Sequence, residues 1–219
     1  MRKYFIMLLV FVPLLVPAQD QDQDKTKSKK KTSQSGIGIK GGLNFAKVTK
    51  ASAVNAGSYT GFHVGVFKST GKKFIGYRMQ LDFARQGYNF KTNTDTGKVD
   101  LDYILFTNCT ALNIGKFAQL YAGLQTTFLI NAKADSTSDQ SGGMSNSIMK
   151  YYNRIGNGLI AGLQIHPYKG IVIGASYTFS FANSFQNPGS GTPNTPTPSF
   201  IPSFDAKNNV LQIYLGYKF

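Results

Sequence analysis

The chain has 219 residues, 42% of them apolar, with 23 Gly, one Cys, no Trp and a formal net charge of +14. This length can build one domain with a sizeable core, and a single Cys excludes a disulfide scaffold and a Cys-based zinc finger. The Gly content is also far below that of a collagen-like fibre.

The first 18 residues have the layout of a secretory signal peptide. Arg2 and Lys3 precede an apolar stretch, and Ala18 supplies a small residue at the cleavage point. A retained membrane helix is the alternative, but the apolar stretch is short and is interrupted by proline. We therefore expect residues 1–18 to be removed and the mature chain to begin at Gln19.

Residues 19–35 are polar, are rich in Asp, Lys and Gln, and have no apolar periodicity. They predict a disordered, Lys-rich periplasmic leader. A solvated tail is the preferred interpretation of its basic run, and attraction to anionic lipid or cell wall is the alternative. Nucleic acid is not expected as a partner, because an exported basic run without aromatic residues rarely meets any.

From Gly36 onward the dominant period of apolar residues is two, which is the period of strands. The last strand shows this best, because its alternate residues from Leu211 to Phe219 are all apolar while the other face is mostly polar or small. Eight strands are expected, at 36–47, 59–68, 75–84, 100–112, 119–132, 154–166, 171–181 and 210–219. The register of the fourth is open, because Ile104, Leu105 and Phe106 run together and either face could be the apolar one.

The connections between these strands alternate in length. Short turns are expected at 69–73, 113–118 and 167–170, and longer loops between the first two strands and at 88–99, 133–153 and 182–208. One end of the sheet therefore carries large loops and the other tight turns. The last loop is rich in Pro, Gly, Ser and Thr, so we expect it to be exposed and mobile.

Two closed eight-stranded architectures fit such a chain: a soluble ligand-carrying barrel of the lipocalin type and an outer-membrane barrel. A soluble barrel turns its apolar face inward and needs a well-charged exterior, whereas a membrane barrel turns its apolar face to lipid and keeps a small, polar interior. Here the second face consists of Gly, Ser, Thr, Gln and Asn with few charges. The sequence therefore predicts an all-β protein, an eight-stranded antiparallel up-and-down transmembrane β-barrel over 36–219, with short periplasmic turns and long extracellular loops, in the bacterial outer membrane.

The end of the chain supports this prediction. Tyr217 and Phe219 form an aromatic ending on the lipid-facing side of the last strand. Bacterial outer-membrane barrels commonly end in this way, and the barrel assembly machinery reads that strand. We therefore expect Tyr217 and Phe219 to act as an assembly signal.

Motifs in five strands resemble the PorT-like family of small outer-membrane β-barrel proteins of Bacteroidota, over about residues 36–219. The motifs are those at Gly41–Asn44, Gly61–Gly65, Gln80–Gly87, Tyr121–Gly123 and Gly216–Phe219. The fourth strand departs from the family pattern, with Leu105 and Thr107 where members often carry Glu and Pro. The resemblance implies the fold and the outer membrane. Most members have no known activity, and PorT itself is tied to protein secretion and gliding machinery.

Five polar side chains are predicted to face the lumen: Lys40, Arg78, Gln80, Asp82 and Gln164. Charges in a narrow lumen are costly unless they are paired, so a hydrogen-bonded plug is the preferred interpretation. A small selective pore is the alternative.

Arg85 falls on the lipid-facing side near the outer headgroups. It either contacts lipopolysaccharide phosphate or extends its charge toward water, and the second is preferred. The lone Cys109 is expected to be a buried or lipid-facing free thiol.

Catalysis is not expected. His63, Ser176 and Asp82 fall on inward faces, but nothing in the sequence aligns their depths, and a Ser hydroxyl within hydrogen-bond reach of His63 would be needed. The two His lie on different strands without ligand spacing, so no metal and no cofactor is predicted. The main hypothesis is a non-enzymatic membrane anchor or interaction scaffold, whose long loops or leader engage an unidentified protein partner and which is linked through the resemblance to secretion or gliding machinery. The rival is a narrow pore for ions or small solutes. Outer-membrane lipid, lipopolysaccharide and the barrel assembly machinery are the other expected partners.

Overall fold

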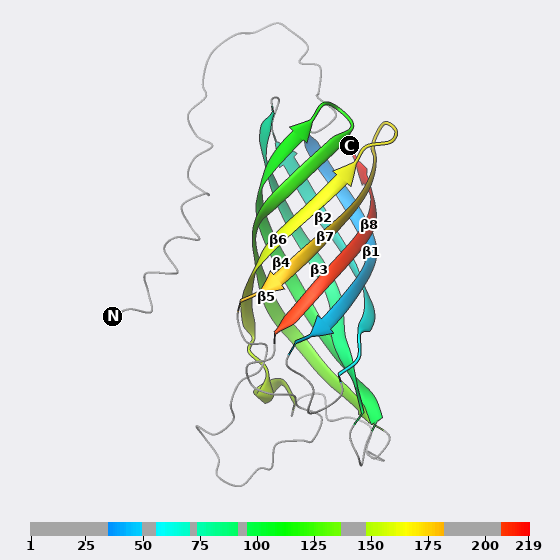
Figure 1. Cartoon of the computed structure of the whole chain (residues 1–219), viewed down its shortest axis with the longest axis vertical. Helices are drawn as coiled ribbons and strands as arrows, with labels where there is room; N and C mark the ends of the chain where they lie inside the picture. The colour runs from blue at the N-terminus through cyan, green and yellow to red at the C-terminus, as the bar shows by residue number, and fades with distance from the viewer. Residues whose placement is uncertain (1–34, 50–55, 71–73, 92–95, 137–147, 182–206) are drawn as a thin grey trace, which may run out of the picture. The chain divides into compact units, whose positions relative to one another are not determined.

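A computed structural model describes residues 35–49, 56–70, 74–91, 96–136, 148–181 and 207–219. The predicted signal peptide, nearly all of the leader and most of the last loop lie outside the described residues. Eight antiparallel strands pair in chain order, and the first strand closes on the last to form a barrel (Figure 1). No helix among the described residues is long and apolar enough to cross a membrane.

Five strands lie within two residues of the predicted ranges at either end. They are β1 (Gly36–Val48), β2 (Tyr59–Thr70), β6 (Ile155–Ile165), β7 (Ile171–Ser180) and β8 (Asn208–Lys218). The other three are longer than predicted: β3 (Ile75–Lys91), β4 (Thr96–Ile114) and β5 (Ala118–Ser136). A short 3-10 helix, η3 (Met149–Tyr151), precedes β6.

The predicted loop at 88–99 is wrong. β3 and β4 pair through it as far as Lys91 and Thr96, so only residues 92–95 separate the two strands. The physical reason is that the alternation continues through the polar residues, because Tyr88, Phe90 and Val99 all point inward and are buried. In the same way, β5 occupies the first residues of the loop predicted at 133–153.

The barrel has two unlike ends. The turn end carries the tight connections between β2 and β3, β4 and β5, and β6 and β7, and the carboxyl terminus lies there, at the top of Figure 1. The loop end carries the other connections. At the loop end, β3, β4 and β5 extend beyond the remaining strands (Figure 1).

The apolar face of the strands points outward. Large apolar side chains such as Ile39, Leu43, Val64 and Leu215 are about half exposed, while the alternate positions are buried and mostly polar or small. In β4 the structure resolves the register that the sequence left open, since Leu105 is buried in the barrel and Ile104 and Phe106 face outward. This is the arrangement of a membrane barrel and the opposite of that of a soluble one.

Two inward glycines make room for tyrosine rings that come from the neighbouring strands. A Cβ atom on Gly162 would lie 2.4 Å from the ring of Tyr121, and one on Gly174 would lie 2.4 Å from the ring of Tyr214. Both distances are far below van der Waals contact, so neither site accepts a side chain unless the ring moves. The absence of a side chain at these two Gly residues therefore leaves the space that the Tyr rings occupy.

We call the extension at the loop end the outer flap and define it as residues 85–91, 96–102 and 131–136. Its inner face is apolar and packs against Ile148, Tyr151 and Tyr152, and the hydroxyls of Tyr88 and Tyr152 lie 2.9 Å apart. Its outward side chains instead pair opposite charges across the strands: Arg85 with Asp102, Lys133 with Asp100, and Lys98 with Asp135. Between the flap and the turn end the outward residues are mostly apolar, with a few uncharged polar side chains such as Asn108 and Thr110, so the change to charge marks where lipid gives way to headgroups and water.

Candidate functional site: a filled lumen and its outer vestibule

A buried ion pair joins β1 to β3 inside the barrel. Lys40 Nζ lies 3.0 Å from Asp82 Oδ2, and each side chain is only 1% exposed. Gly65 of β2 lies between them in the sheet, paired with both residues. Because Gly65 has no side chain, the Lys40 ammonium can pass over β2 to reach the carboxylate.

Arg78 occupies the lumen nearer the turn end and is fully buried. Its Nη1 donates to Gln164 Oε1 at 2.5 Å and to Gln119 Oε1 at 3.5 Å. The guanidinium carbon lies 4.3 Å from the ring centroid of Phe67 and 4.8 Å from that of Tyr121. Amide oxygens and ring faces, rather than a carboxylate, therefore surround this charge.

Two tyrosines complete a bridge across the lumen. The hydroxyls of Tyr121 on β5 and Tyr214 on β8 lie 3.1 Å apart, and Tyr214 Oη also donates to Gln164 Oε1 at 3.2 Å. Lys40 Nζ lies 5.0 Å from the centroid of the Tyr214 ring. Side chains of β1, β2, β3, β5, β6 and β8 thus meet in this half of the lumen.

Of the five predicted lumen residues, four belong to this network. The fifth, Gln80, is also buried, but its amide has no hydrogen-bond partner among the described residues. Sequence reasoning missed Gln119, Tyr121 and Tyr214. The alternation already placed all three residues on inward faces. The inward Gly residues on the neighbouring strands, paired with the two tyrosines, were the signal that tyrosine rings fill this part of the lumen.

The catalytic candidates do not form a hydrogen-bonded group. Ser176 Oγ donates to Gln212 Oε1 at 3.4 Å, and neither ring nitrogen of His63 has a partner among the described residues. Asp82 faces Lys40. The described part of the chain also contains no cluster of three or more His, Cys, Asp or Glu that could hold a metal ion, and Cys109 is buried within the barrel.

Arg85 lies on the outer face, as predicted from the alternation, but it is held by a carboxylate. Its Nε donates to Asp102 Oδ1 at 2.7 Å and its Nη2 to Asp102 Oδ2 at 3.2 Å. Asn131 Nδ2 donates to the same carboxylate at 3.1 Å, and the guanidinium lies 5.6 Å from the Phe62 ring. The Arg85 side chain remains 38% exposed. This ion pair was absent from both interpretations of Arg85, and the predicted lipopolysaccharide contact stays a prediction.

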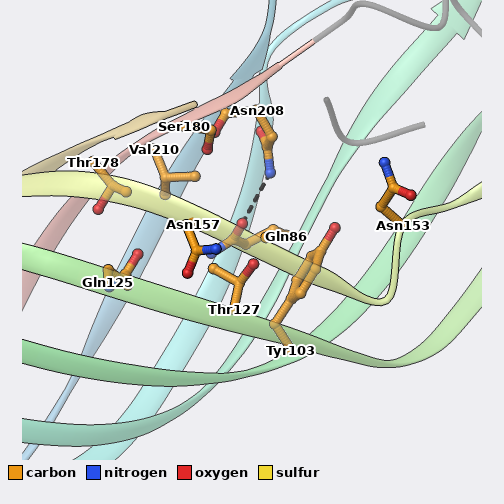
Figure 2. A pocket seen from close by; sticks show the side chains of 11 residues that line it. Gln86, Tyr103, Gln125, Thr127, Asn153, Asn157, Thr178, Ser180, Asn208 and Val210 are labelled. Carbon is orange, nitrogen blue, oxygen red and sulfur yellow. Dashed lines mark hydrogen bonds between the residues drawn. The ribbon is translucent and has the colours of Figure 1, made fainter. Parts of the chain in front are cut away.

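A vestibule lies on the loop-end side of the filled part of the lumen, and Figure 2 shows the residues that line it. Among the residues that the structure describes, no charged side chain lines the vestibule; the lining consists of amides and hydroxyls with one aromatic ring, one aliphatic side chain and one glycine. The lining residues come from β3 to β8 and the segment before β6: Gln86, Tyr103, Gln125, Thr127, Asn153, Gly156, Asn157, Thr178, Ser180, Asn208 and Val210.

Hydrogen bonds fix several of these amides. Asn208 Nδ2 donates to Gln86 Oε1 at 2.9 Å, which is the dashed line in Figure 2. Gln125 Nε2 donates to Thr107 Oγ1 at 3.0 Å at the base of the vestibule. This vestibule could not be predicted from the sequence, because its lining residues come from six strands and their common depth depends on the register.

A closed eight-stranded antiparallel barrel with lipid-compatible side chains outside and a polar lumen inside is an outer-membrane β-barrel. The sequence matches the model of the outer membrane protein beta-barrel domain family over residues 18–186, and the chain belongs to this family. The protein is therefore located in the bacterial outer membrane, where barrels of this type place their short turns in the periplasm and their longer connections outside.

Solved structures of the same architecture resemble the chain. Neisserial surface protein A superposes with a TM-score of 0.54 at 16% sequence identity, covering 84% of this chain and 98% of that one. Ail, the attachment invasion locus protein of Yersinia pestis, gives a TM-score of 0.49 at 20% identity, covering 84% and 99%. No curated protein matches the sequence. These likenesses concern the fold, and the finer PorT-like assignment stays a prediction.

Proposed function

We propose that this barrel is a closed, non-enzymatic membrane anchor that displays its outer flap and loops to a protein partner. The observation that carries the proposal is the contact between Tyr121 and Tyr214, with Arg78 and Gln164, across the lumen. A link to secretion or gliding machinery rests only on the PorT-like resemblance and forms part of the same proposal.

Opening a path for ions would require this network to separate. The Lys40–Asp82 pair is almost fully buried, and a buried charge left without its partner costs several kcal/mol. A water-filled pore would instead require the charges to line a wall and leave the axis free. The observed side chains instead join strands that are not neighbours in the barrel, β3 with β6 and β5 with β8, which supports a plug.

The outer flap supports the display role. Its strands extend by about six to eight residues past the last apolar outward positions, which are Phe83, Ile104 and Ile130. This corresponds to roughly 20–26 Å along the strand. Opposite charges alternate across its outward face, and the pair formed by Arg85 and Asp102, at 2.7 Å, is closer than the pair formed by Lys98 and Asp135, at 3.8 Å. A charged, paired surface of this kind suits water and a polar partner, not lipid tails.

Lipopolysaccharide is the proposed lipid partner, with Arg85 at its phosphates. The guanidinium keeps part of its surface open beside Asp102 and stands above the Phe62 ring, where the headgroups begin. Arg85→Gln should reduce the increase in unfolding midpoint that added lipopolysaccharide gives the refolded barrel. Lys98→Gln, which changes a more exposed ion pair farther from the membrane, is the matched control. An equal response of both variants to lipopolysaccharide would remove Arg85 from the proposed contact.

Single-channel recording in a planar bilayer tests the anchor proposal. The wild-type barrel, shown to be folded by its heat-modifiable migration, should be silent. The double variant Tyr121→Ala/Tyr214→Ala should conduct, because two rings and their hydrogen bonds leave the lumen, whereas Tyr168→Ala in an exposed turn should remain silent. Reproducible current steps from the wild type would overturn the proposal.

The second candidate is a narrow pore, and the charge of the lumen favours a pore that is selective for anions. Lys40 and Arg78 face the interior together with Asp82 as the nearest carboxylate. A conducting barrel with this lining should prefer anions, because the cationic side chains outnumber the acidic one. A measured cation preference would exclude this version of the pore.

A further inference from the structure

An amide faces lipid halfway along β4. Asn108 points outward and is half-buried, and it lies six residues from Ile114 at the turn end and six residues from Asp102 in the flap. Six residues span roughly 20 Å along a strand. On a strand tilted by about 40° this is roughly 15 Å of height, which is half the thickness of the hydrocarbon core. Asn108 therefore lies near the middle of the membrane.

Half of this amide has no partner. Tyr77 Oη of β3 donates to Asn108 Oδ1, whereas Asn108 Nδ2 makes no hydrogen bond with any described residue. The hydrocarbon core holds no water that could accept from the Nδ2 group, so leaving it unpaired there is unfavourable. A hydrogen-bond acceptor on another molecule at the same depth would remove this cost.

Uncharged polar side chains that face lipid are confined to one side of the barrel. Asn108, Thr110, Thr126 and Asn157 point outward from β4, β5 and β6. In the described parts of β1, β2, β7 and β8, no Asn, Gln, Ser or Thr points outward within 37–45, 62–68, 171–179 and 211–217. A surface that meets only acyl chains gains nothing from such side chains, so the side around Asn108 is the one suited to a protein contact.

A hollow of about 620 Å³ lies beside Asn108. Thr110, the next outward residue of β4, pairs with Ala122 of β5, which pairs with Ala161 of β6, and these three small side chains lie within the hollow. On the other side of Asn108, β3 carries the larger outward side chains of Met79 and Leu81. A depression and a raised surface therefore flank the same amide.

We propose that this face joins two copies of the chain, related by a twofold axis along the membrane normal that passes beside Asn108. Two copies in one membrane have the same orientation, so the axis brings the two Asn108 side chains together at one depth. An Asn amide both donates and accepts, so each Nδ2 donates to Oδ1 of the other copy, whose second lone pair is free beside Tyr77. The same axis sets Met79 and Leu81 of one copy against the hollow of the other.

A second hollow shows why the amide decides the occupant. It has a volume of about 460 Å³ and lies at Gly41, which pairs with Val64 and Leu215 on the other side of the barrel. Its outward residues are apolar or aromatic, so acyl chains satisfy it. An acyl chain has no acceptor for Asn108 Nδ2, whereas a second copy brings one at the required depth.

This inference does not rest on the anchor proposal. The contact is on the outer face of the barrel, so it forms whether or not the lumen conducts. The charges of the outer flap begin at Asp102 and lie outside the membrane, where they stay accessible. Recording from the bilayer and measurement of the mass of the assembly therefore fail separately.

Sedimentation equilibrium of the full-length refolded barrel, in a detergent matched in density to the solvent, tests the proposal. The wild type should pass from monomer to dimer, and not to larger assemblies, as the ratio of protein to detergent rises, because a twofold contact closes. Asn108→Leu should weaken dimerisation about tenfold or more, because two amide hydrogen bonds are lost. Ala161→Leu should also weaken it by filling the hollow, and keeps the test valid if Asn108→Leu fails to fold.

Two matched controls should dimerise as the wild type does. Asn209→Leu makes the same replacement at an outward position of β8, and Gly41→Val fills the other hollow. Urea unfolding of the monomers separates association from folding. Asn108→Leu should unfold at the same or a higher urea concentration than the wild type, because it replaces an amide that faces lipid with an apolar side chain.

Disulfide crosslinking in the outer membrane of cells locates the contact. In a Cys109→Ser background, Thr110→Cys lies close to the proposed axis and should crosslink two copies. Ile213→Cys on β8, which is four strands away from β4 in either direction, should not. Crosslinking of Ile213→Cys and not of Thr110→Cys would place the contact on the wrong side of the barrel and overturn the inference.

The mass measurement gives three further results that would overturn it. The first is a wild-type barrel that stays monomeric at the highest ratio of protein to detergent, which would leave the hollow to acyl chains. The second is that folded Asn108→Leu and Ala161→Leu variants dimerise as the wild type does. The third is that Asn209→Leu or Gly41→Val weakens dimerisation as much as Asn108→Leu.

Discussion

Removing the charge of Asp82 should destabilise the barrel more than any single surface substitution. In the Asp82→Asn variant the Lys40 ammonium stays in the lumen and loses the carboxylate that lies 3.0 Å away. At an effective dielectric constant of 20, two unit charges at that distance attract by about 5.5 kcal/mol. Loss of one partner from a buried pair costs about 3–5 kcal/mol in soluble proteins, so we expect a loss of about that size.

Asp135→Asn is the matched control. Asp135 lies 3.8 Å from Lys98 on the outer flap, and the side chains of Lys98 and Asp135 are 50% and 78% exposed. An exposed pair at this separation contributes about 0–1 kcal/mol, because water and salt screen it. The two Asp→Asn variants therefore change the same chemical group with and without burial.

The assay is urea unfolding of barrels refolded in lipid vesicles. Far-UV circular dichroism and the gel shift of the folded barrel report the transition, since the chain has no Trp. A second variant, Lys40→Met/Asp82→Leu, removes both charges and should recover most of the lost stability, because apolar replacement of a buried pair is often neutral or stabilising. The reasoning is refuted if Asp82→Asn and Asp135→Asn have the same unfolding midpoint, or if the double variant is as unstable as Asp82→Asn.

Two further predictions concern the small residues and the carboxyl terminus. Gly162→Val should lower the refolding yield and reduce the free energy of unfolding by about 1–3 kcal/mol or more, because its Cβ would lie 2.4 Å from the Tyr121 ring. Gly41→Val on the outer face is the control and should refold normally, since the nearest atom to its Cβ would be 3.6 Å away. Equal refolding yields would contradict the tight fit. Phe219→Ala should reduce the amount of barrel in the outer membrane of cells but not its refolding in vesicles, and Phe117→Ala, in an exposed turn, should change neither. A refolding defect in Phe219→Ala would mean that Phe219 acts through stability and not as an assembly signal.

The sequence predicts the strands well because one physical constraint acts along each of them. Most outward residues within the membrane must be apolar, so the period of two is strong from Leu211 to Phe219 and in the other spanning segments. The strands of the flap were not predicted, because this constraint does not act on residues outside the membrane. Above the membrane the outward residues are charged or polar, as at Asn89 and Lys98, and the alternation resembles a loop until Tyr88 and Val99 are known to be buried.

The contacts between side chains in the lumen depend on the register of the strands, in addition to the alternation within each strand. The alternation places Lys40 and Asp82 on inward faces, but only the register sets them at one depth, with Gly65 between them. Register in a closed barrel follows from how all the strands stagger together, and no single strand encodes it. Pairings across the lumen, such as Tyr121 with Tyr214, and the lining of the vestibule therefore could not be found from the sequence.

The continuity of the flap with the barrel bears on how a partner would be bound. The β3–β4 ladder runs without interruption from Ile75 paired with Leu112 to Lys91 paired with Thr96, so the flap is a direct extension of the membrane-spanning sheet. Its inner face is held by the apolar cluster that includes Tyr88 and Tyr152. A partner that docks on the outward charges meets a surface that is already ordered, and its binding is not weakened by the cost of ordering a loop. Such a surface fits a role in which the barrel fixes the position and orientation of another component at the membrane.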